Sequence, residues 1–279
     1  GGLTRLVDKR KVRRDRADVF STLAEGLKGK RAKEWGLIDG YFPTSKFQES
    51  IDARVKQIAN SAAPVEGIKL TPLEFERTDD SRNYKYVKLK LNRDQRYADL
   101  TVHAPEGPQP ATAEQIQELG AAYWPLQAYR ELDDALLHLR VNEPLIGLVC
   151  LRTEGDAETV LAIDQTLAAN RDHWLVREII LHMARVLRRL DLTAKSFFAI
   201  VEPGSCFAGN LLELLLASDR SYMLKDSEQG DASLAVSELN QGAFPMSNGL
   251  TRMQSRFLAE PERLDQVFGD KKIFDTEEA

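Results

Sequence analysis

The sequence has few cysteines and no long apolar runs, and these shortages exclude several classes of protein. Among 279 residues there are two cysteines, Cys150 and Cys206, which are too few for a framework of disulfides. No apolar run approaches the roughly 20 residues that cross a bilayer. The first residues also lack the apolar core of a signal peptide. We therefore expect a cytoplasmic protein without membrane contact.

The chain also lacks an excess of basic charge. Its net charge of −5 gives no general attraction to nucleic acid or to anionic membranes. One local basic stretch, KRKVRRDR at residues 9–16, allows two interpretations. It either contacts phosphate or forms the solvated face of a helix, and the acidic total favours the second. We expect no nucleic-acid partner.

Common catalytic motifs and an initiator methionine are missing as well. There is no P-loop, GxGxxG, HExxH or GxSxG sequence, and the four histidines are scattered. Because these motifs are absent, we expect the protein to bind neither a metal nor a redox cofactor. Because the chain does not begin with methionine, we expect it to be an internal fragment of a longer protein.

Hydrophobic periodicity divides the chain into three segments. Residues 1–60 are expected to be helical, and Phe47, Ile51 and Val55 share one face of a helix there. Residues 61–83 carry prolines and many charges, which is typical of a linker or of a connection that wraps around a domain. Residues 84–279 alternate between strand and helix patterns. This alternation predicts a layered α/β fold.

The third segment begins with a strand pair, because apolar and polar residues alternate from Tyr84 to Glu106. The two apolar strands that follow are expected to be covered on both faces, as in a parallel sheet. The elements predicted after the strand pair are a helix at 130–140, a strand at 144–153, a helix at 175–191, a strand at 195–203 and a helix from about Asn210.

The turn before this last helix is a candidate binding site. Backbone N–H groups near Gly209 lie at a helix N-terminus, where an anion or an oxyanion is stabilised. Glu213 follows among leucines, and such surroundings raise the pKa of a carboxyl group into the range useful for proton transfer. Glu238 follows after a loop, in SELNQG. Two glutamates beside an oxyanion-binding turn suit the addition or removal of water next to a carbonyl.

Simpler interpretations of the same residues stay open. Glu213 could cap a helix or form an ion pair. Glu238 could be an ordinary surface residue. Cys206, in GSCFAG, is either a nucleophile or a plain core residue. His182 lies on an amphipathic helix and is expected to be packed or at the surface.

Two motifs resemble the enoyl-CoA hydratase, or crotonase, superfamily. The first is the strand, turn and helix that carry Glu213 and, six residues later, Asp219, in the manner of the E-L-A-x-x-x-D helix of that superfamily. The second holds Glu238, Gly242, Pro245, Gly249 and Arg252 in the family's order. GGLTRL at residues 1–6 matches the end of this second motif, NGLTRM. The resemblance therefore implies two partial modules.

The resemblance implies a ClpP/crotonase-like layered β-β-α superhelix. Residues 1–60 would be the C-terminal part of a first module, and residues 84–279 a second module that is truncated at its C-terminus. The tandem arrangement is similar to a superfamily member that opens the ring of an aromatic acyl-CoA epoxide with water. That similarity implies an acyl-CoA substrate, a lyase activity in aerobic aromatic degradation and a homodimer.

The same resemblance assigns roles to four residues. Glu213 and Glu238 would be the catalytic acid and base, and Gly209 and Gly242 would bind the oxyanion or the acyl-CoA. Another hydratase or isomerase of the superfamily is an alternative function.

The sequence also departs from the family pattern. The turn reads Ala208-Gly209-Asn210 rather than three glycines, and the second oxyanion loop would fall at Val160–Asp164, which lacks the expected Phe and Gly. The second module is thus either catalytic or a degenerate structural or dimerisation module, with the working glutamates in the first.

Overall fold

The computed structural model describes residues 2–61, 67–225, 228, 230–269 and 273–279. The chain divides into two compact units, Gly1–Gly67 and Ile68–Ala279. The division falls inside the predicted linker, of which residues 62–66 lie outside the described residues. Residues from Ile68 onward belong to the second unit.

The first unit is helical, as predicted. Its elements are α1 (Gly2–Thr4), the π-helix η1 (Arg5–Lys9), α2 (Arg14–Thr22), α3 (Gly29–Glu34) and α4 (Thr44–Ser61). The buried apolar residues among those described are Val12, Ala17 and Ala32. The apolar face predicted for α4 forms, but Phe47 and Val55 on it are exposed.

The basic stretch of the first unit pairs with acidic groups nearby. Arg10 contacts Asp39 at 3.2 Å, and Arg14 contacts Asp18 at 3.1 Å one helical turn away. Arg16 donates a hydrogen bond to the carbonyl of Glu34. The charged side chains of this stretch thus form a solvated surface with local ion pairs, although residues 10–13 lie between η1 and α2 and are not helical.

The second unit is built on a seven-stranded sheet with the strand order β1-β2-β3-β4-β5-β6-β7. Strands β1 to β4 are antiparallel to their neighbours, and β4 to β7 run parallel. The strands are β1 (Glu76–Arg77), β2 (Ser81–Asn83), β3 (Val87–Asn92), β4 (Tyr97–His103), β5 (Leu148–Glu154), β6 (Ser196–Val201) and β7 (Arg220–Met223). A small sheet pairs β8 (Leu234–Ala235) with β9 (Ile273–Phe274). The predicted α/β class and the predicted strand pair are confirmed.

The strand register places one apolar row across the sheet. Leu89 pairs with Leu100, Leu100 with Leu151, and Leu151 with Ala199, and all four side chains are fully buried. The opposite face of β5 is only partly covered, and Arg152 lies there in ion pairs with neighbouring acidic residues. The expectation that β5 and β6 are covered on both faces is therefore wrong.

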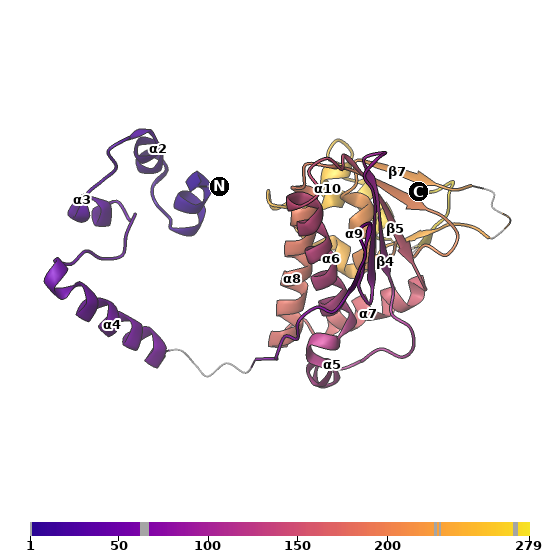
Figure 1. Cartoon of the computed structure of the whole chain (residues 1–279), viewed down its shortest axis with the longest axis horizontal. Coiled ribbons are helices and arrows are strands. Elements are labelled where there is room, and N and C mark those ends of the chain that lie inside the picture. Colours follow the sequence, from indigo (N-terminus) through magenta and orange to yellow (C-terminus); the bar gives the residue numbers. More distant parts are fainter. Residues whose placement is uncertain (1, 62–66, 226–227, 229, 270–272) are drawn as a thin grey trace. The chain divides into compact units, whose positions relative to one another are not determined.

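Helices pack against this sheet and against one another. The helical elements of the second unit are α5 (Ala113–Leu119), η2 (Gly120–Ala122), α6 (Trp124–Val141), α7 (Ala157–Ala169), α8 (Trp174–Asp191), α9 (Gly209–Leu216), η3 (Glu238–Gln241), α10 (Arg252–Arg256) and α11 (Arg263–Val267). Helix α6 contacts β3 of the sheet. Figure 1 shows α6 and α8 side by side, and the two helices pack together. Helix α9 packs against α7, η3, β5 and β6. In the described part of the chain, no helix is both long and apolar enough to cross a membrane.

Candidate functional site

The predicted binding turn lies between β6 and α9. After β6 the chain turns at Gly204, Ala208 bridges to Ala235, and α9 begins at Gly209. Gly209 has a φ of +49°, and a Cβ atom built there would lie 2.1 Å from Oδ2 of Asp164. Both the left-handed conformation and the close approach of Asp164 therefore require glycine.

Asp164, on α7, fills the space above this turn. Its Oδ2 accepts hydrogen bonds from the backbone N–H of Asn210 at 2.8 Å and from Oγ of Ser237 at 2.6 Å. Its Oδ1 accepts one from Nδ2 of Asn210. The side chain is almost fully buried. Burial raises the pKa of Asp164 to about 7, although the three donors favour the charged form.

Glu213 lies one turn along α9 and is 1% exposed. Its Oε2 accepts a hydrogen bond from Nη1 of Arg252 at 2.8 Å, and its Oε1 accepts one from Nδ2 of Asn240 at 2.8 Å. Arg252 also forms a two-pronged ion pair with Asp191. Burial raises the pKa of Glu213, and the Arg252 guanidinium opposes this shift.

Side chains from several elements join these groups into one buried network. Asn240 donates to the carbonyl of Gly209 at 2.9 Å as well as to Glu213. Tyr129, on α6, donates to the carbonyl of Asn210 at 3.0 Å. We call the network the polar cluster; it consists of Tyr129, Asp164, Asn210, Glu213, Asn240 and Arg252. It ties α6, α7, α9, η3 and α10 together.

Glu238 and Gly242 lie elsewhere. Glu238 begins η3 and is exposed, and both residues line a surface groove of about 470 Å³ together with Arg171 and Arg177. The backbone of Gly242 is extended, with a φ of −178°. Of the four predicted site residues, Gly209 and Glu213 thus belong to the buried region, and Glu238 and Gly242 to the surface groove. Their catalytic and binding roles stay predictions.

The segment expected to form a second oxyanion loop is helical instead. Val160–Asp164 lies inside α7, which begins after the N-cap Asp156. The N–H of Val160 donates to the carbonyl of Asp156, so it is already bonded within the helix. The expectation of a loop is therefore corrected. The residue that sequence reasoning missed is Asp164, which reaches the turn from this helix.

Cys206 is a core residue in this structure. Its side chain is fully buried, and burial raises the pKa of its thiol to about 11. A thiol with such a pKa is protonated at neutral pH and is a poor nucleophile.

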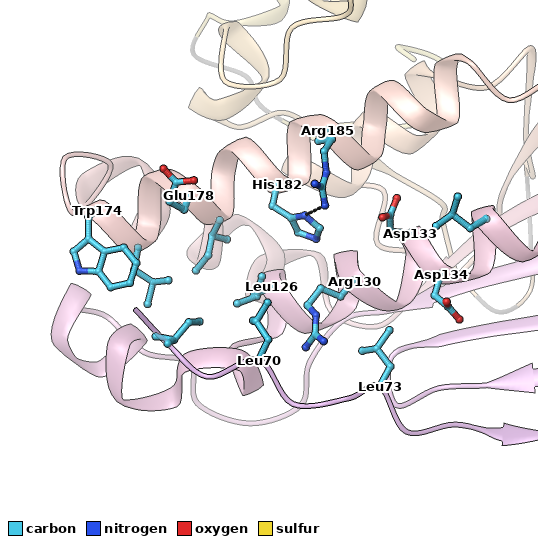
Figure 2. Close-up of a pocket in the computed structure, with 14 residues that line it drawn as sticks. Leu70, Leu73, Leu126, Arg130, Asp133, Asp134, Trp174, Glu178, His182 and Arg185 are labelled. Atoms are coloured by element: carbon cyan, nitrogen blue, oxygen red, sulfur yellow. Dashed lines mark hydrogen bonds between the residues drawn. The ribbon is translucent and has the colours of Figure 1, made fainter. Parts of the chain in front are cut away.

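A second groove, of about 520 Å³, lies between α6 and α8, and Figure 2 shows its lining. Leu70 and Leu73, from the predicted linker, form one wall. Arg185 donates to Nδ1 of His182 at 3.1 Å, so Nε2 carries the hydrogen. Within the described residues, this Nε2 is buried without a hydrogen-bond partner. None of the four predicted site residues lines this groove.

Comparison with known proteins gives one strong sequence match. The chain is 49% identical over 263 residues to the benzoyl-CoA-dihydrodiol lyase of Aromatoleum evansii. It is homologous to part of that lyase. The match covers 93% of this chain and 47% of the relative, so the chain spans about half the length of the curated relative. The predicted similarity to a lyase of aromatic acyl-CoA thioesters is thereby confirmed. No family model matches the chain.

Solved structures similar to this chain include enoyl-CoA hydratases. An enoyl-CoA hydratase/carnithine racemase from Magnetospirillum magneticum has a TM-score of 0.44 and 20% identity, covering 71% of this chain and 65% of that chain. An enoyl-CoA hydratase from Bacillus halodurans has a TM-score of 0.44 and 17% identity, covering 70% of this chain and 69% of that chain.

Proposed function

We propose that this chain is part of a lyase that opens the ring of 2,3-epoxybenzoyl-CoA with water. The seven-carbon acyl group would release formate and leave a six-carbon semialdehyde as its CoA thioester. The observation that carries the proposal is the 49% identity to benzoyl-CoA-dihydrodiol lyase over 93% of the chain. The protein would act in aerobic aromatic degradation in the cytoplasm, as a homodimer, without a metal or redox cofactor.

Formate release by the natural protein that contains this chain tests the proposal. Incubated with 2,3-epoxybenzoyl-CoA, it is expected to release one formate per thioester consumed, and dialysis against EDTA is expected to leave the rate unchanged. Hydration of crotonyl-CoA without formate release from the epoxide would support the alternative, another enzyme of the enoyl-CoA hydratase/isomerase type.

A second candidate function, a non-catalytic supporting or dimerisation module, is favoured by the burial of Glu213. Both of its carboxylate oxygens are bonded inside the protein, and it is 1% exposed. Glu238 is exposed and so remains available to a substrate. If Glu238 is the working acid or base, Glu238→Gln should lower formate release by roughly 100-fold or more. Glu158→Gln, at another exposed glutamate, is the control. Equal rates for both variants would favour the supporting module.

A further inference from the structure

The start of α9 has the features of an anion-binding site. The first N–H groups of a helix have no partner inside the helix, and the helix dipole adds positive potential there. Here the backbone N–H and the side-chain amide of Asn210 point to the same place, and the hydroxyl of Ser237 joins them. Three hydrogen-bond donors that converge in this way are typical of a site that binds the two oxygens of a carboxylate.

The protein itself supplies that carboxylate. Both oxygens of Asp164 accept hydrogen bonds from these donors, and its Oδ2 lies where a side chain at Gly209 would have to pass. Only 1% of Asp164 is exposed. A thioester oxygen approaching the turn would have to displace a carboxylate that is fixed covalently to α7.

The neighbouring groups close the turn further. Asn240 donates to the carbonyl of Gly209, and Tyr129 donates to that of Asn210. Glu213, the next carboxylate along α9, is neutralised by Arg252 at 2.8 Å. The elements α6, α7, η3 and α10 thus each contribute a group that is already paired within the protein.

We propose that Asp164 is a built-in ligand, whose carboxyl group occupies the anion-binding turn of α9 so that this turn binds no acyl-CoA. The hydrogen bonds from Asn210 and Ser237 to Asp164 hold α7, α9 and η3 together. If the carboxylate is removed, the turn becomes a site for a small free carboxylate such as formate. This inference concerns the fold of the chain and does not depend on the lyase activity.

Hydrogen exchange of the Asn210 amide in the 279-residue chain tests the inference. The measurement is made at pH 8, above the pKa of Asp164 of about 7, so that the carboxylate is charged. Asp164→Ala is expected to speed exchange of this amide by about tenfold or more, because the N–H loses a charged acceptor. Formate at 100 mM should slow it again, whereas sodium chloride of equal ionic strength should not. Asp172→Ala, at an exposed loop position, is the matched control and should change nothing.

Two results would overturn the inference. One is an Asn210 amide that exchanges equally fast with and without the Asp164 carboxylate. The other is a formate effect of the same size in the wild-type chain and in Asp164→Ala.

The wild-type chain gives an independent measurement should Asp164→Ala fail to fold. Benzoyl-CoA is expected to leave the amide exchange rates at Ala208–Leu212 unchanged. If benzoyl-CoA slowed exchange of these amides more than about threefold compared with free CoA, the proposal that Asp164 occupies the turn would be contradicted. If the natural protein released no formate while the exchange results were as expected, the lyase proposal would be refuted and the inference about Asp164 would stand.

Discussion

Replacing Arg252 with methionine is expected to destabilise the second unit by about 3–5 kcal/mol, because the change leaves a buried charge without its partner. Arg252 lies 2.8 Å from Glu213, and the two side chains are 2% and 1% exposed. Asp191, its other partner, is 17% exposed and keeps some contact with water. The penalty therefore falls mainly on Glu213, which retains only the hydrogen bond from Asn240.

Urea unfolding of the 279-residue chain, followed by circular dichroism at pH 7, measures this effect. Arg256→Met is the control, because Arg256 lies on the same short helix and is exposed. That variant should change the free energy of unfolding by less than about 0.5 kcal/mol.

A double variant separates the charge effect from the loss of packing. Glu213→Gln removes the unpaired charge, so the combination of Arg252→Met with Glu213→Gln should be more stable than Arg252→Met alone by about 2 kcal/mol. The reasoning is refuted if the two changes are simply additive, or if Arg252→Met costs no more than the Arg256 control.

Three further predictions follow from the polar cluster and its surroundings. The pKa of Asp164 is about 7 when folded against an ordinary value of 3.8, so stability should fall by about 3 kcal/mol as pH rises from 4 to 7. Asp164→Asn should remove this part of the slope in urea titrations, and equal slopes would contradict it. Gly209→Ala should cost more than about 3 kcal/mol, since its Cβ would meet Asp164, whereas Gly242→Ala, in open space with extended backbone, should be nearly neutral in thermal unfolding. Cys206, fully buried, should react with a thiol reagent only after urea unfolding, and prompt labelling of Cys206 in the folded Cys150→Ser variant, which lacks the partly exposed second thiol, would contradict its place in the core.

Local sequence pattern was sufficient for elements whose hydrophobic period is strong. The helix predicted at 175–191 is α8, where Val176, Ile179 and Met183 are buried at helical spacing. The alternation after Tyr84 gives β3 and β4. The short strands β1 and β2 were missed because their residues are charged or polar, so no apolar alternation marks them.

The candidate site was only half predictable. Gly209 and Glu213 share one turn and the start of one helix, so the sequence placed them together. It also predicted Glu238 beside them, whereas the structure places Glu238 on the surface at the start of η3. The irregular segment before η3 has no repeating pattern from which the direction of this side chain could be read.

The sequence alone determined the α/β class, the main helices and strands, and the relationship to an acyl-CoA lyase, because each depends on residue order or local period. Only the tertiary structure decided the state of the turn before α9. Asp164 lies 46 residues from Asn210 in the chain, and α7 brings its carboxylate to the backbone N–H at 2.8 Å. A contact of this kind depends on how two helices pack, and no local pattern records it.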